Sequence, residues 1–346
     1  MTSADPRDGF ALPAVLTVTG VVTLVFVVAI TALASLTAEA AAARSRINFL
    51  QRALTLEANV AYLAVSEPIN TRAIAVGAVR STDDQFSAAV PVEVSSGLGS
   101  GEIFLDGQVY STDLRGPMTI ALRDQAGLLN LPQLNADQWR TLGERMGVER
   151  IGLESLQPRF RDYVDSDDLV IQGGGERDAY GVVGPANRPL LRPVEWLSVL
   201  GARRAVSPPR WRALRQELAA DQMQTTFNIN TASAATLEIL FNLTQQQAAR
   251  AVESRRSTPF TDLVDLAAAT GVTPEGDSEI SYVFPSGRIL FTLSDGRSSW
   301  VYRGRLTITP SDAERPVWID QTDVMESPRN SVADTTNATP LPYPIR

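Results

Sequence analysis

The spacing of apolar and charged residues predicts one long helix at the N-terminus. No charged residue occurs between Phe10 and Leu36, and an apolar run of this length can cross the roughly 30 Å hydrocarbon core of a membrane as a helix. Beyond this run, apolar residues recur at roughly helical spacing as far as Pro68, with arginines and Glu57 between them. The pattern therefore predicts a transmembrane helix that continues into water as an amphipathic helix.

Alternating apolar and polar residues then predict a sheet that is interrupted by helices. The stretches 101–114 and 116–127 alternate as strands do and contain Gly, Asp and Ser as turn residues. Helical periodicity follows from Gly127 to about Gly271, and strand-like alternation returns after residue 278. Because strands and helices are segregated along the chain, the expected fold class is α+β, with an α/β module that contains a large all-α insertion.

Composition excludes most catalytic chemistries. The 346 residues carry a net charge of -8 and contain no Cys, no His and no Lys. Without these residues there is no Ser-His-Asp or Cys-His unit, no His-ligated zinc, no P-loop lysine and no Schiff base. An acidic balance also argues against non-specific binding to nucleic acid, which needs a basic face. What remains is carboxylate chemistry and oxygen ligation of metals.

One acidic cluster is a candidate for such ligation. Four aspartates fall within seven residues, and two more acids follow a glycine-rich loop. Oxygen-only clusters suit Ca²⁺, which accepts six to eight hard ligands in flexible geometry, although the spacing here is not that of an EF-hand. A solvated turn and a glycosidase-like carboxylate pair are the alternatives. The candidate ligands are Asp162, Asp165, Asp167, Asp168, Glu176 and Asp178.

The extreme N-terminus combines a short polar leader that ends in Gly9 with an apolar helix that begins at Phe10. A cleaved secretory signal is the alternative, but the apolar run is longer than the usual 7 to 15 or so residues. The arrangement resembles the class III signal of type IV pilins and type II secretion pseudopilins. The resemblance implies cleavage between Gly9 and Phe10 and methylation of Phe10. The family's common Glu at the fifth position of the processed chain is Ala14 here, as in K-type minor pseudopilins.

The helical block contains a second resemblance. The stretch 226–242 places asparagines before a helix that Asn230 or Thr231 can cap, with Ser233 as an alternative cap, and a second helix follows. This order resembles the helix-hairpin-helix or SAM-like units of K-type pseudopilins and of competence DNA receptors. DNA-binding hairpins carry a Gly-apolar-Gly turn, whereas the turn over 241–247 contains no Gly. The sequence therefore argues against a nucleic-acid partner.

Taken in order, these features resemble the K-type minor pseudopilins of bacterial type II secretion over nearly the whole chain. The Asp-rich stretch, Tyr180, Asn187 and Trp196 also follow that family's pattern. The resemblance implies six segments: a leader over 1–9, a transmembrane helix over 10–36, the amphipathic helix and first part of the α/β module over 37–120, the helical insertion over 121–275, the returning β part over 276–324, and a disordered tail over 325–346.

The function implied by the resemblance is structural, not enzymatic. Such a protein forms the tip of the periplasmic pseudopilus and helps to initiate its assembly for export of folded proteins. The implied partners are I-type and J-type minor pseudopilins, other pseudopilins, the prepilin peptidase and the inner-membrane secretion platform. No cofactor is required, but the family is associated with structural Ca²⁺ in the helical domain.

The resemblance also implies a single-pass inner-membrane protein with a periplasmic C-terminal domain. The distribution of arginine disagrees, because Arg7 precedes the apolar run whereas Arg44, Arg46 and Arg52 follow it. Two alternatives share parts of the pattern: a minor pilin or tip adhesin of a type IV pilus, and a membrane-tethered DNA receptor.

Overall fold

The computed structural model describes residues 11–77, 101–224, 226–275, 281–296, 298–326 and 338–343. Helix α1 (Ala11–Ser66) is 56 residues long, and its most apolar window has a mean hydropathy of 2.5. It is therefore long and apolar enough to anchor the chain in a membrane, and it ends two residues before Pro68. The chain divides into two units, Met1–Thr55 and Leu56–Arg346, and the second holds the sheet and the other helices.

A six-stranded sheet is the frame of the second unit. Its strand order is β10-β3-β4-β7-β8-β9, antiparallel except for the pairing of β10 with β3. A two-stranded sheet pairs β1 with β2, and a parallel pair joins β5 to β6. The strands are β1 (Ala73–Val76), β2 (Gly101–Phe104), β3 (Asp106–Asp113), β4 (Pro117–Asp124), β5 (Leu129–Asn130), β6 (Leu218–Ala219), β7 (Arg288–Ser294), β8 (Trp300–Ile308), β9 (Val317–Glu326) and β10 (Thr339–Pro340).

The last turns of α1 contribute to the buried side of this frame. Leu56, Val60 and Leu63 are almost fully buried at the spacing of one helix face. Glu57 on the same helix accepts a hydrogen bond from the hydroxyl of Tyr302 on β8. Gly304, two residues further along β8, lies so close to the Phe291 ring that a Cβ atom would come within 2.2 Å of it. A side chain at this position would therefore force the ring out of the core.

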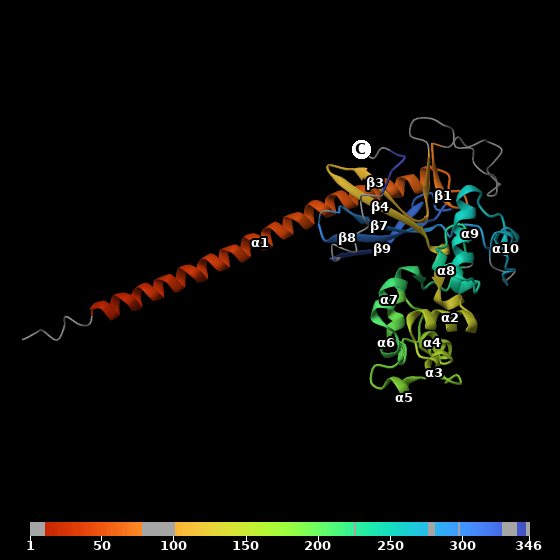
Figure 1. Ribbon diagram of the computed structural model, residues 1–346, viewed down its shortest axis with the longest axis horizontal. Coiled ribbons are helices and arrows are strands. Elements are labelled where there is room, and N and C mark those ends of the chain that lie inside the picture. The colour runs from red at the N-terminus through yellow and green to blue at the C-terminus, as the bar shows by residue number, and fades with distance from the viewer. Residues whose placement is uncertain are drawn as a thin grey trace, which may run out of the picture. The chain divides into compact units, whose positions relative to one another are not determined.

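All the other helices interrupt the sheet at one point. β4 ends at Asp124 and β7 begins at Arg288, yet the two strands are hydrogen-bonded neighbours, with Asp124 opposite Ile289. The chain between them leaves the sheet and returns to the adjacent position, so this stretch is an insertion. Figure 1 shows these helices in two groups, α2–α7 and α8–α10.

The first group packs around stacked tryptophans. The ring centroids of Trp139 and Trp196 are 6.1 Å apart, and those of Trp196 and Trp211 are 5.7 Å apart. Each of these rings is at least nine-tenths buried, so the stack is the centre of this core. The helices are α2 (Ala136–Met146), α3 (Arg150–Leu153), α4 (Leu156–Val164), α5 (Arg177–Tyr180), α6 (Ala202–Ala205) and α7 (Pro208–Leu214).

The second group is a helical hairpin with a third helix, formed by α8 (Ala234–Leu240), α9 (Gln245–Ser257) and α10 (Leu263–Thr270). Each helix begins at a side-chain cap: the Ser233 hydroxyl accepts from the backbone of Thr236, Thr244 forms a capping box with Gln247, and Asp262 caps α10. These caps satisfy backbone N–H groups that have no partner within the helix.

Two boundaries of the expected segments need correction. The insertion does not begin at residue 121, because Leu122 pairs with Phe291 in the sheet and β4 continues to Asp124. The expectation that the chain is disordered from residue 325 onward is wrong in two places. β9 extends to Glu326, and Thr339–Pro340 forms β10 along β3, with the Leu341 amide donating to the Ser111 carbonyl. Backbone pairing with a neighbouring strand explains why a segment with few apolar residues is ordered there.

Candidate functional site

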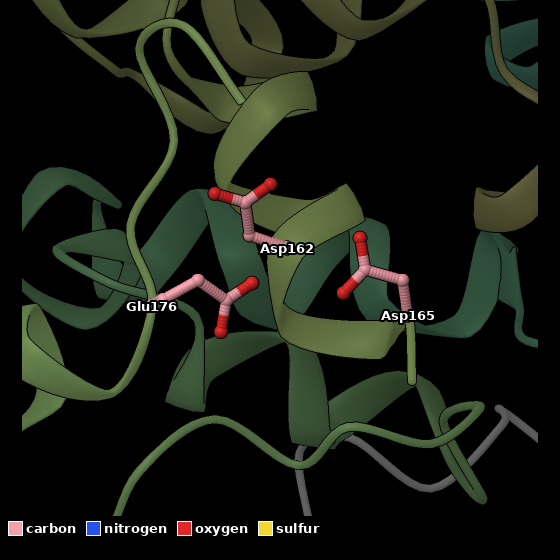
Figure 2. A group of neighbouring side chains, drawn as sticks. All are labelled: Asp162, Asp165 and Glu176. Carbon is pink, nitrogen blue, oxygen red and sulfur yellow. The ribbon is translucent and has the colours of Figure 1, made fainter. Parts of the chain in front are cut away.

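Three carboxylates come together in the first helical group. Asp162 lies in the last turn of α4, Asp165 directly follows that helix, and Glu176 precedes α5. One carboxylate oxygen from each residue lies within 4.8 Å of one from the others, and Figure 2 shows the three side chains gathered at the end of the helix. Asp162 and Glu176 are buried, whereas Asp165 is half-buried.

The glycine-rich loop holds Asp162 in this position. Its carboxylate accepts hydrogen bonds from the backbone N–H of Gly175, at 2.7 Å, and of Ile171, at 3.2 Å to the nearer oxygen. A Cβ atom on Gly174 would lie 2.1 Å from the Asp162 carboxylate. The loop can wrap this carboxylate only because residue 174 has no side chain, so the run of glycines serves the acidic cluster.

The other two carboxylates keep unpaired oxygens. Oδ1 of Asp165 and both Oε1 and Oε2 of Glu176 are buried without a hydrogen-bond partner in the described part of the chain. Burial, followed by the charge of Asp162, raises the pKa of Glu176. Burial, followed by the charges of Asp167 and Asp162, raises the pKa of Asp165. Buried carboxylates without a cation or donor are costly, so the cluster is incomplete in the protein alone.

These residues fit a divalent cation with hard oxygen ligands. Ca²⁺ takes six to eight oxygens from carboxylates, amides and waters at roughly 2.3–2.6 Å. The unpaired oxygens of Asp165 and Glu176 would be direct ligands of the cation. The carboxylate of Asp162 could add a ligand through its remaining lone pairs. Such a cation would offset two of the three negative charges, which otherwise repel one another. The donor set contains no nitrogen or sulfur, which is the chemistry of calcium and not of zinc.

The three remaining predicted ligands lie apart from this cluster. Oδ1 of Asp167 accepts from the backbone N–H of Leu169 at 2.8 Å, as in a simple turn. Asp168 accepts from the side-chain amide of Asn187 at 3.3 Å, and Asp178 is exposed on α5. Asn187 was not among the sequence candidates, yet its Oδ1 is buried and unpaired among the described residues. The signal that could have found it is the Asn-Arg-Pro stretch over 187–189, which follows the acidic loop in the sequence.

The processing site belongs to the N-terminal segment. Gly9 and Phe10 lie outside the described residues, so cleavage between them and methylation of Phe10 remain predictions. Ala14 lies in the first turn of α1 and is exposed. The helix therefore carries no carboxylate at this position.

The asparagine-rich start of the hairpin connects it to the sheet. The side-chain amide of Asn228 donates to the Thr71 carbonyl at 2.8 Å and to Asp124 Oδ2 at 3.1 Å. Asn230 forms a two-way bond with the backbone of Phe260, at 2.9 Å and 2.8 Å, which closes the far end of the hairpin. Both asparagines are buried. Their pattern in the sequence therefore marks internal hydrogen bonding and not a ligand-binding surface.

The turn between α8 and α9 has none of the glycines that bring a backbone close to a phosphate. Asn242 adopts a left-handed conformation with φ of 49°, and Leu243 next to it is buried in the hairpin core. Asparagine tolerates this conformation better than other non-glycine residues. The turn is therefore built for tight packing.

Comparison with known proteins agrees with this arrangement. Residues 227–281, which include the asparagine-rich segment and the hairpin, match the family described as type II secretion system (T2SS), protein K. A chain in the crystal structure of the GspK-GspI-GspJ complex from the enterotoxigenic Escherichia coli type 2 secretion system has a similar fold. The alignment has a TM-score of 0.54 and 18% identity and covers 82% of this chain and 99% of that chain. No curated protein matches the sequence significantly.

An N-terminal helix, a sheet frame and a helical insertion between neighbouring strands make up the fold that this chain shares with the solved structure. The fold follows from the structural likeness, and the type follows from the hairpin sequence over 227–281. These two findings support the K-type minor pseudopilin of type II secretion that the sequence resembles. The N-terminal helix is long and apolar enough to anchor the chain in a membrane.

Proposed function

We propose that this protein forms the tip of the periplasmic pseudopilus and helps to initiate its assembly. The observation that carries the proposal is the point at which the insertion leaves the sheet. A filament grows through repeated head-to-tail contacts, so a subunit whose upper face is covered can only end it. The insertion leaves at Asp124 and returns at Arg288, and both residues lie at one end of the six-stranded sheet.

The course of the chain after residue 56 supports this assignment. Glu57 contacts Tyr302 on β8. The residue before it, Val301, lies opposite Ser294, the last residue of β7. Asp124 lies at the other end of β7, opposite Ile289. Further along, the backbone of Thr71 and the side chain of Arg72 contact the hairpin. The chain therefore enters the frame at one end and reaches the insertion at the other. The insertion therefore leaves the sheet at the end opposite to the one that Glu57 contacts.

Ala14 supports the same role. In the processed chain it is the fifth residue, where most pilin-like subunits carry a glutamate that meets the N-terminal amine of a neighbour. A carboxylate within hydrocarbon is costly unless it is paired. A tip subunit has no neighbour above it, so an uncharged residue at this position avoids that cost.

The partners we infer are an I-type and a J-type minor pseudopilin. The similar solved structure is of a complex of GspK with GspI and GspJ. Assembly with such subunits requires the folded unit to lie in the periplasm, with α1 in the inner membrane, after processing at Gly9 by the prepilin peptidase. In this arrangement the arginines that follow the apolar run lie several turns beyond it, where they influence topology less.

We also infer that Ca²⁺ occupies the carboxylate cluster as a structural ion. The unpaired oxygens of Asp165 and Glu176 support this inference. The ion would hold the loop between α4 and α5 and would take no part in a reaction.

Co-assembly tests the tip function directly. The full-length protein in detergent is mixed with the I-type and J-type subunits of the same secretion system, and the mass of the product is measured by light scattering. We expect one copy of each subunit in a stable complex. In cells, deletion of the gene should abolish secretion and reduce the number of pseudopili. A protein that neither joins these subunits nor affects secretion would overturn the proposal.

A further inference from the structure

Proline occupies every second position of the segment at the C-terminal end of the chain. The prolines are Pro340, Pro342 and Pro344, and Thr339, Leu341 and Tyr343 alternate with them. A proline ring fixes its own φ and disfavours the helical region for the residue before it, so this alternation favours an extended chain. Successive residues of an extended strand turn their backbone groups to opposite sides. Prolines at alternate positions of a strand therefore lie on one side of it.

The pairing of β10 with β3 shows which side this is. Ser111 of β3 lies opposite Pro340, and its carbonyl accepts a hydrogen bond from the Leu341 amide at 2.8 Å. The backbone of Leu341 therefore faces β3, and that of Pro340 faces away from it. Because proline has no N–H, Pro340 gives the outward side of β10 no amide donor, and Pro342 in the bend that follows gives none either.

Side chains at two further points fix this segment along β3. The Gln108 side-chain amide donates to the Thr339 hydroxyl at 3.2 Å. Pro342 lies against Gly101, where an added Cβ atom would be 2.7 Å from the Pro342 Cβ atom. The absence of a side chain at Gly101 therefore leaves room for Pro342, and the segment is seated at both of its ends.

The edges of the six-stranded sheet differ in what protects them. β9, at one edge, carries Asp320, Asp323 and Glu326 and an irregular register with β8. Charges and bulges of this kind discourage a further strand from pairing with an edge. β3 carries acids only at its two ends, Asp106 and Asp113. Its uncharged middle has no such protection, and this is the part that β10 covers.

We propose that Thr339–Tyr343 is an edge cap that keeps β3 from pairing with the β3 strand of a second copy of this chain. An uncovered edge fits such a copy because its row of N–H and C=O groups is complementary to an identical antiparallel strand. The cap occupies this row on its inner side. On its outer side the prolines withhold the N–H groups that a further strand would need. The role concerns the folded unit alone and is independent of the tip function.

The test is the mass of the full-length protein in detergent, measured by sedimentation velocity over a range of protein concentrations. A chain that ends at residue 337 lacks the cap, and its mass should rise with concentration to about twice the wild-type value or more. The wild type should show no such rise. Pro340→Ala combined with Pro342→Ala keeps the segment but restores two amides, so this variant should also associate, to a smaller extent. Pro310→Ala is the matched control, because Pro310 is exposed in the turn between β8 and β9, and it should match the wild type.

A charge at the uncovered edge tests where the copies meet. In the chain that ends at residue 337, the Gln108 side chain no longer has Thr339 as a partner. Gln108→Lys in this chain places a positive charge at the β3 edge and should return the mass to the wild-type value. Association that persists with this lysine would place the contact elsewhere and overturn the edge cap.

The remaining outcomes also decide the question. A truncated chain that keeps the wild-type mass at every concentration overturns the edge cap. Association of the truncated chain without association of the double proline variant overturns the role of the prolines and leaves the cover of β3 by the segment. Thermal melting at low concentration shows whether the truncated chain is folded, and its melting temperature should stay close to that of the wild type, since Thr339 and Pro340 are exposed. Should the truncated chain unfold, the double proline variant, which keeps the whole segment, gives the answer.

Discussion

The side-chain amide of Asn228 donates a hydrogen bond to the Asp124 carboxylate at 3.1 Å, across 104 positions of sequence. Asp124 ends the strand from which the insertion leaves, and Asn228 lies at the start of the segment that matches the family model of type II secretion system protein K. The same carboxylate accepts from Ala126, from the hydroxyl of Thr231, and from the amide and hydroxyl of Ser286. One buried acid therefore joins the sheet, the hairpin and the returning chain.

Replacement of Asp124 should destabilise the protein strongly. Asp124→Asn keeps the shape of the side chain, but its amide NH₂ would face groups that are themselves hydrogen-bond donors. Leaving such buried donors unpaired should lower the free energy of unfolding by on the order of 3 kcal/mol. The matched control is Asp137→Asn, since Asp137 is exposed and pairs only with Arg140, and its effect should stay below about 0.5 kcal/mol. Thermal and urea unfolding of both variants measure the difference. Equal stability of the two would show that the Asp124 network contributes little.

Calcium should bind through the clustered carboxylates of Asp162, Asp165 and Glu176 and not through the exposed Asp178. Isothermal titration calorimetry with CaCl₂ after chelation should show binding and a raised melting temperature for the wild type. Glu176→Gln should weaken that binding at least tenfold because it removes a ligand charge from the cluster. Asp178→Asn serves as the control, as this acid is exposed on α5 and should leave the affinity unchanged. Absence of heat and of a melting shift in the wild type would rule out the ion.

The pH dependence of the metal-free protein should report the same cluster. The pKa values of Glu176 and Asp165 are raised in the folded protein, so it binds protons there more strongly than the unfolded chain does. Stability from these groups is therefore present at low pH and is lost as pH rises through the raised values. The difference in melting temperature between the calcium-free wild type and Glu176→Gln should therefore be smaller at pH 5 than at pH 7. Added Ca²⁺ should raise the melting temperature of the wild type at pH 7, because the ion then balances the carboxylate charges that protons balance at low pH. A difference in melting temperature that stays constant between pH 5 and pH 7 would contradict this prediction.

Processing should depend on Gly9. Gly9→Ala should leave the leader attached, and mass spectrometry of the membrane-extracted protein should show the intact N-terminus without a methyl group on Phe10. In the wild type the N-terminus should be methylated Phe10. Ala11→Ser, two residues beyond Gly9 in the mature helix, is a control that should not prevent cleavage. A wild-type chain that begins at Met1, or a cut within the alanine-rich stretch 38–43, would contradict the processing site.

Several features were predictable because they depend on neighbouring residues. Helix α1 follows from an uncharged run and from helical spacing up to its end at Ser66. Ser233 was one of the candidate caps, and it caps α8 because a short polar side chain reaches the backbone N–H three residues later. The order of strand-like and helix-like patterns likewise predicted an insertion. Its start shifted from 121 to 125, because the local pattern could not reveal that Leu122 pairs with Phe291, and the chain returns to the sheet at Arg288 and not at 276.

The acidic cluster shows where such reasoning ends. The sequence offers six acidic residues as candidate ligands and gives no way to rank them, and the tertiary structure brings three of them together. The selection depends on which carboxylates the Gly174 loop encloses and on burial from packed helices, neither of which is encoded in local spacing. The Nε atom of Arg303 is similar: alternation along β8 orients the side chain, but only the pairing of Asp323 with Arg192 leaves this atom without an acceptor among the described residues.

By itself, the sequence determined the membrane-suited helix, the exclusion of histidine, cysteine and lysine chemistry, the α+β class and the family resemblance, since each rests on composition, periodicity or motif order. The tertiary structure decided which acids lie close enough to share a cation, which arginines of the sheet pair with a carboxylate, and that the C-terminal segment pairs with β3. These depend on residues brought together from distant parts of the chain, where packing and burial set the free energy of each charge.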